Sequence, residues 1–152
     1  TRDYSMMLAD GGFRVTHVST HVSLREACDR VKKKRVEKVI HLTNDTLQRL
    51  GIDAPRIAVA GLNPHCGEGG ILGKEDDEII APVVREYASK GLSGPHPGDT
   101  VFIKLRARQF DAVVVTNYLW RPLLPTLVRL SLVIARLLLA IAPSMARLAS
   151  GC

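Results

Sequence analysis

Apolar and polar positions alternate along residues 15–22, which read VTHVSTHV. This period of two predicts a β-strand over 15–22, with His17, Ser19 and His21 on one face. Two short apolar runs, at 57–60 and at 110–115 (FDAVVV), predict two further strands that are buried on both faces.

Between these strands, apolar residues recur at helical spacing. A helical region is predicted from Ser23, where SLRE forms a capping box, to Gly51, with the basic run at 32–35 marking a break between two helices. A second helical region runs from about Glu75 to Gly91 and is kinked or divided at Pro82. Residues 94–100 are predicted to be a loop in which Asp99 caps a short helix. This β-α-β-α-β order predicts an α/β fold with a mainly parallel sheet.

The length of 152 residues suits one domain, and because the chain begins with Thr1 we expect it to be a piece of a longer protein. Its three cysteines (Cys28, Cys66 and Cys152) are widely spaced and odd in number, so they do not indicate a disulfide framework. A cytoplasmic location is therefore expected.

The net charge of +6 does not indicate nucleic-acid binding, because of where the charges lie. Four arginines and no acidic residue lie at 116–152, which leaves 17 basic and 15 acidic residues at 1–115. The one basic run, KKKR at 32–35, has no aromatic residues between its cations for stacking on bases, so a solvated helix face explains it better.

Residues 116–152 differ in kind from the rest, with ten leucines, four arginines and no acidic residue. Arg129 and Arg136 interrupt the apolar stretch at 127–142, so we expect an amphipathic helical tail and no membrane span. This composition is also what an out-of-frame translation of GC-rich DNA would give, so a frameshift is an alternative explanation of the tail.

The chemistry-bearing residues follow the predicted strands. A loop with glycines at 67, 69, 70 and 73 follows the strand at 57–60 and carries Asn63, His65 and Glu68. His21 and His65 stand at the carboxyl ends of predicted strands, where ligands of α/β enzymes bind. Two imidazoles alone seldom hold a metal ion, so a hydrogen-bonded structural role for either histidine stays open. Asp99 is either a helix cap or an active-site residue.

Four segments carry a resemblance to a known family: THVSL around His21, AGLNPHCGEGG around His65, GPHPGDT around Asp99, and FDAVVV. In this order and at this spacing, they resemble the 4-hydroxythreonine-4-phosphate dehydrogenase family over about residues 1–115. The segment HVSTHVSLREACD at residues 17–29 is most similar to a subgroup that includes enzymes acting on four-carbon acid phosphates such as threonate 4-phosphate.

The resemblance implies an isocitrate/isopropylmalate-dehydrogenase-like fold and a homodimer. It also implies oxidation, with decarboxylation, of 4-hydroxythreonine 4-phosphate by NAD or NADP on the route to pyridoxal phosphate. A divalent metal (Zn, Mg or Co) at the dimer interface is held by three histidines in that family, and two of them correspond to His21 and His65. Asp99 corresponds to an aspartate near the substrate. D-threonate or D-erythronate 4-phosphate is the alternative substrate.

The chain also departs from the family pattern. The third histidine of the family belongs to a MYHDQG element after the FDAVV strand, where this chain reads TNYLWRP, and no histidine follows His96. We therefore expect a partial dehydrogenase domain at 1–115, a divergent Leu/Arg-rich tail at 116–152, and an inactive, truncated copy. The alternatives are a non-catalytic dimerising module and a small metal-binding protein that uses His17, His21 and His65.

Overall fold

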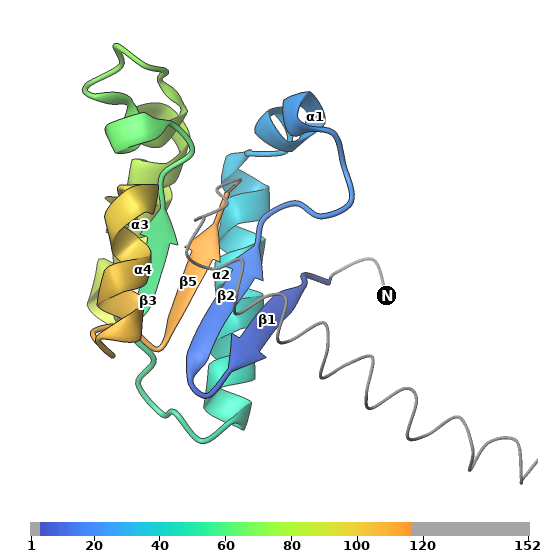
Figure 1. Cartoon of the computed structure of the whole chain (residues 1–152), viewed down its shortest axis with the longest axis vertical. Coiled ribbons are helices and arrows are strands. Elements are labelled where there is room, and N and C mark those ends of the chain that lie inside the picture. The colour runs from blue at the N-terminus through green and yellow to red at the C-terminus, as the bar shows by residue number, and fades with distance from the viewer. Residues whose placement is uncertain (1–3, 117–152) are drawn as a thin grey trace, which may run out of the picture. The chain divides into compact units, whose positions relative to one another are not determined.

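A five-stranded sheet forms the centre of the computed structural model, which describes residues 4–116 (Figure 1). The strands are β1 (Met7–Asp10), β2 (Phe13–His17), β3 (Ile57–Ala60), β4 (Leu92–His96) and β5 (Ala112–Val115). Their order in the sheet is β1-β2-β5-β3-β4. β1 pairs antiparallel with β2, and every other pair of neighbours is parallel. The predicted α/β fold with a mainly parallel sheet is confirmed.

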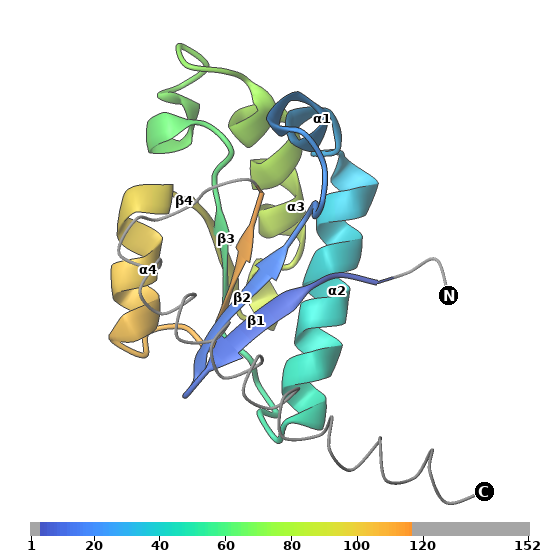
Figure 2. The ribbon, with the colours of Figure 1, turned by 45° about the vertical axis from the view of Figure 1, so that its right-hand side comes forward.

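Helices cover both faces of this sheet. The longer elements are α2 (Lys33–Arg49) and α4 (Gly98–Arg106), and the shorter ones are α1 (Leu24–Asp29), the π-helical turn η2 (Asp76–Ile80), α3 (Ala81–Glu86) and the turn η3 (Ala88–Lys90). Figure 2 shows α2 and α4 on opposite sides of the strands. α2 and α3 pack against each other, and α4 contacts β3 and β5.

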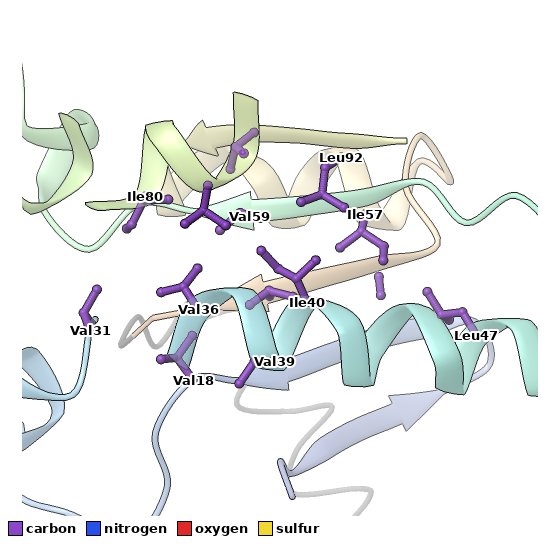
Figure 3. Close-up of a cluster of buried hydrophobic side chains, with 14 residues drawn as sticks. Val18, Val31, Val36, Val39, Ile40, Leu47, Ile57, Val59, Ile80 and Leu92 are labelled. Atoms are coloured by element: carbon purple, nitrogen blue, oxygen red, sulfur yellow. The ribbon is translucent and has the colours of Figure 1, made fainter. Parts of the chain in front are cut away.

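The main core lies between the sheet and the helices α2 and α3 (Figure 3). Val36, Val39, Ile40 and Leu47 lie on one face of α2 because they recur at helical spacing, and all four are fully buried. Alternate strand residues meet them, with Ile57 and Val59 from β3 on the same side as Ala112 and Val114 from β5. The predicted apolar runs are therefore buried strands, as expected for the interior of a parallel sheet.

The prediction of a strand over 15–22 is wrong after His17. The neighbouring strand β5 ends at Val115, whose carbonyl accepts a hydrogen bond from Val18 N at 2.9 Å, and beyond this point no strand among residues 4–116 pairs with the segment. It turns instead, and His21 has a φ of +57°. His17, Ser19 and His21 consequently do not share a strand face.

Two strands were not predicted. β1 joins β2 through Gly11 and Gly12, which both have positive φ, as two-residue hairpin turns require. β4 (Leu92–His96) overlaps the region predicted to be a loop at residues 94–96, and it is an edge strand, the position in which a sheet tolerates Pro95. The capping prediction for Asp99 is also wrong: α4 begins at Gly98 with Pro97 as its N-cap, and Asp99 lies inside the first turn.

The helix boundaries agree with the sequence signals. Ser23 Oγ accepts a hydrogen bond from Glu26 N at 3.3 Å, and the chain leaves α1 just before the basic run. Gly51 and Gly91 have φ of +84° and +83° where helical segments end. Pro82 lies at the start of α3, directly after the π-helical turn.

The expected tail lies almost wholly outside the described residues, since only Thr116 of it is included. Within residues 4–116, no helix combines the length and the apolar character that crossing a bilayer requires.

The amino-terminal ends of β3 and β5 are joined by an ion pair. Asp111 accepts hydrogen bonds from Arg56 N at 2.8 Å, Nε at 3.2 Å and Nη2 at 3.0 Å, and Arg56 O accepts one from Asp111 N at 2.8 Å. The hydrogen bond from the Arg56 side chain is the main cause that holds the pKa of Asp111 below its ordinary value of 3.8.

We predict that Leu47→Ala lowers the free energy of unfolding by about 3 kcal/mol, because it leaves a cavity beneath α2. Leu50→Ala serves as the control, since Leu50 is 59% exposed at the end of the same helix and its loss should change stability by about 0.5 kcal/mol or less. Urea unfolding measures both variants, and equal losses would contradict the assignment of the core.

We also predict that stability depends on pH through Asp111. Because folding lowers its pKa, its contribution is complete above the unfolded value of about 4 and disappears as pH falls through the folded value. The gap in stability between wild type and Asp111→Asn should therefore be largest near pH 7 and shrink below about pH 4. Urea unfolding over this range tests the prediction, which a gap independent of pH would disprove.

Candidate functional site

The three predicted site residues all follow parallel strands at their carboxyl ends. His21 comes after β2, His65 after β3 and Asp99 after β4. The carboxyl ends of parallel strands lie at one edge of the sheet, and Figure 1 shows α1 and the loop after β3 at this same end. Because β5 lies between β2 and β3, the two histidine loops flank the carboxyl end of β5.

A buried carboxylate fixes the loop that carries His65. Asp76, which is fully buried, accepts hydrogen bonds from Leu62 N at 2.8 Å and from Asn63 N and Nδ2, both at 3.0 Å. Three N–H donors satisfy a charge that would otherwise be costly to bury. The first residues of the loop are therefore tied to the start of the helical segment that follows it.

Asn63 also joins the two ends of this loop. Its Nδ2 donates to Glu75 Oε2 at 2.8 Å, and this bond is the main reason that the pKa of Glu75 lies below its ordinary value. Gly73 has a φ of +135°, and a Cβ there would lie 2.4 Å from Asn63 Nδ2. A side chain at 73 would thus collide with the amide that closes the loop.

The backbone between the two ends is strained. Every residue from His65 to Gly70 has a positive φ, three of them without being glycine: His65, Cys66 and Glu68. Left-handed backbone costs an L-residue roughly 1–2 kcal/mol, and such strain concentrates at functional sites. Among residues 4–116, five non-glycine residues have positive φ, and four of these lie in the two histidine loops, His21 included.

The structure brings the His65 loop and Asp99 together. α4 packs against the turn η1 (Pro64–Gly67) that contains His65. Burial is the main cause that raises the pKa of the Cys66 thiol to about 11, and the charges of Asp76 and Asp99 raise it further. The thiol therefore stays protonated near neutral pH.

His21 is not part of this cluster. It is exposed and lines a hollow of about 300 Å³ together with His17, Ser19 and Thr20. His17 Nε2 is buried without a hydrogen-bond partner in the described chain, and burial lowers the pKa of that imidazole. Between residues 4 and 116, no three His, Cys, Asp or Glu side chains lie close enough to hold a metal ion.

One further histidine lies near the sheet edge. His96 Nε2 is hydrogen-bonded to Ser93 Oγ at 2.9 Å, and its ring packs on Phe110 with centroids 5.3 Å apart. Burial, followed by the charge of Lys104, lowers the pKa of His96. Its hydrogen bond and ring contact give it a structural role in β4.

Asp76 was not identified from the sequence. It appears there as the second of four consecutive acidic residues at 75–78, and nothing distinguishes it from Asp77, which is exposed. The one sequence signal for a buried acceptor is the loop that begins 13 residues earlier, because its backbone amides need hydrogen-bond acceptors. At this distance in sequence, the pattern does not show which acidic residue accepts these bonds.

Known proteins resemble this chain over its first part. Residues 1–118 match the family described as Pyridoxal phosphate biosynthetic protein PdxA. A 4-hydroxythreonine-4-phosphate dehydrogenase from Desulforapulum autotrophicum is 48% identical over 113 residues, covering 72% of this chain and 33% of the relative. A D-threonate 4-phosphate dehydrogenase from Pectobacterium atrosepticum is 45% identical over 116 residues, covering 75% of this chain and 36% of the relative.

A solved structure agrees with these relatives. The crystal structure of 4-hydroxythreonine-4-phosphate dehydrogenase from Klebsiella pneumoniae superposes with a TM-score of 0.73 at 42% identity, covering 76% of this chain and 36% of that protein. The chain spans about a third of the length of each of these three proteins.

We predict that Asp76→Asn lowers the free energy of unfolding by about 3 kcal/mol, because the amide puts a donor where three N–H groups need an acceptor. Asp77→Asn removes a neighbouring exposed charge and should change stability by about 0.5 kcal/mol or less. Urea unfolding gives both values, and hydrogen exchange at the amides of Leu62 and Asn63 should accelerate only in the Asp76 variant. Equal behaviour of the two variants would show that Asp76 does not hold the loop.

Proposed function

The chain belongs to the pyridoxal phosphate biosynthetic protein PdxA family, and we propose that it is part of a dehydrogenase that oxidises a phosphorylated four-carbon hydroxy acid. The observation that carries this proposal is the strained backbone of both histidine loops at the carboxyl edge of the parallel sheet. Strain of this kind persists only where the surrounding structure enforces it, and Asp76 does so for the His65 loop.

We propose that His21 and His65 supply two ligands of a divalent metal site, for Zn, Mg or Co. Residues 4–116 do not form a complete site, so a third ligand must come from elsewhere. The position flanked by both loops is the carboxyl end of β5, after which the third histidine of the family pattern would follow. A bound divalent metal would act as a Lewis acid on the substrate hydroxyl.

Asp99 is proposed to contact the substrate, as the motif GPHPGDT implies. Its position in the first turn of α4, which packs on the His65 turn, supports this role because the carboxylate is exposed and near the loop. NAD or NADP would accept the hydride, and the second subunit of a homodimer would complete the site. A cytoplasmic location accords with such a metabolic enzyme.

Two substrates are proposed on equal terms. 4-Hydroxythreonine 4-phosphate is supported by the 48% identical relative, and D-threonate 4-phosphate, or its D-erythronate isomer, by the 45% identical one. Both carry a hydroxyl for oxidation and a phosphate at the far end of a four-carbon chain, so one metal site suits either.

We further propose that this 152-residue chain is inactive by itself. No histidine follows His96, so the third metal ligand of the family pattern is missing from TNYLWRP and from the rest of the tail. The non-catalytic alternatives, a dimerising module or a metal-binding fragment, would keep the same loops without turnover.

The decisive experiment joins residues 1–115 of this chain to the corresponding remainder of the Pectobacterium atrosepticum relative. We expect the chimera to reduce NAD or NADP with a divalent metal and D-threonate 4-phosphate or 4-hydroxythreonine 4-phosphate, whereas the 152-residue chain should show no turnover. Within the chimera, His21→Ala and His65→Ala should each lower kcat/KM about 100-fold or more, since each removes a metal ligand.

His41→Ala is the matched control in that chimera. His41 is an exposed histidine of α2 that bonds only to Tyr87 Oη, at 3.3 Å, among the described residues. Its replacement should leave kcat/KM within about twofold. A folded chimera in which the variants at 21 and 65 behave like the one at 41 would refute the metal-site proposal, and turnover by the unmodified chain would refute its inactivity.

A further inference from the structure

The basic run KKKR at 32–35 does not form one uniform solvated face. Lys33 is paired with Glu86 at 3.4 Å, and Lys34 is exposed on the first turn of α2. Lys32 and Arg35 instead line an open hollow of about 470 Å³ beside the start of α2. The hollow is completed by Tyr4, Ser19, Thr20, Asp29 and Arg30.

Arg35 is held in place without losing its charge. Its Nε donates to Val18 O at 2.8 Å, and Nη1 and Nη2 each donate to Tyr4 O at 3.2 Å. Both acceptors are neutral carbonyl groups, so the guanidinium charge is not cancelled by a carboxylate. These bonds join the start of α2 to the chain on either side of the β1–β2 hairpin and fix where the charge lies.

The remaining lining groups leave the hollow positive. Arg30 is already paired with Glu26, with Nη2 and Oε1 2.7 Å apart. Lys32 is exposed and has no ion-pair partner among residues 4–116. Asp29 is the one acidic residue of the lining, so Lys32 and Arg35 supply the charge that remains available to a ligand.

The polar lining suits a phosphate group. Ser19 and Thr20, which carry hydroxyl groups, line the same hollow as the two cations. A phosphate monoester carries about −1.5 to −2 charges with three acceptor oxygens. The volume falls within the range of about 300–1,000 Å³ that is typical of small-molecule sites.

We propose that Lys32, Arg35, Ser19 and Thr20 form a binding site for the phosphate group of a small molecule. This site is additional to the proposed metal site, although Ser19 and Thr20 also line the hollow that contains His21. A bound phosphate would thus contact the segment that carries His21 and restrict its movement.

The test uses the whole 152-residue chain, labelled with ¹⁵N, without metal or nucleotide. Inorganic phosphate and glycerol 3-phosphate are titrated separately at an ionic strength held constant with sodium chloride. We expect saturable shifts of the amide signals of Ser19, Thr20 and Lys32. Tighter binding of the ester would identify an organic phosphate as the ligand, equal binding would identify free phosphate, and shifts that do not saturate with either would overturn the proposal.

A pair of variants separates a site from general attraction to a basic surface. Lys32→Ala should weaken phosphate binding about tenfold, the loss expected for one charge-assisted hydrogen bond. Lys34→Ala removes the same charge two residues away, outside the hollow, and should change the affinity less than about twofold. Equal weakening by both variants would overturn the proposal. Because the titration measures binding and requires no turnover, its result is independent of the chimera's activity.

Discussion

The His65 loop depends on a single buried carboxylate. The hydrogen bonds that Asp76 accepts from Leu62 and Asn63 fix the chain that leads into the strained backbone from His65 to Gly70, and the Asn63–Glu75 bond and the packing of α4 add to this support. Burying this charge is possible because the loop turns its amide groups inward toward one acceptor. The same residue begins the helical segment that packs against β4, so one residue supports both the core and the candidate site.

Much of the fold could be predicted from local signals. The apolar runs at 57–60 and 110–115 (of which 112–115 is β5), the serine cap of α1 and the glycines after the helices act over a few residues. Their effect on structure therefore does not depend on distant partners. The errors arose where a partner decides the structure. β2 stops at His17 because β5 stops at Val115, and β4 is a strand despite Pro95 because it occupies an edge. The two glycines of the β1–β2 turn are a local hairpin signal in the sequence, because both have the positive φ that such a turn requires.

The sequence motifs predict the candidate ligands and the substrate-binding residue, but not the residues that hold them in place. His21, His65 and Asp99 were found through motifs, and the sheet order explains why residues so far apart in sequence reach one edge. Sequence patterns carried no information on Asp76, because its neighbours in an acidic run look identical and only the folded chain buries one of them. Nor could the pattern of cations show that Lys32 and Arg35 line a hollow while Lys34 does not.

The position of β5 also bears on how the chain is made. β2 and β3 do not pair with each other; β5 lies between them, although it is the last of the five strands that the structure describes. During synthesis on the ribosome, the strands of β1-β2 and β3-β4 are therefore made before the strand that joins them in the sheet. Val15, for example, can pair with its partner Val113 only after the 97 residues between them have been made. Only when residues 112–115 have been made can β5 pair with the inner edges of β2 and β3. Until then, these two edges are open to pairing with other nascent chains.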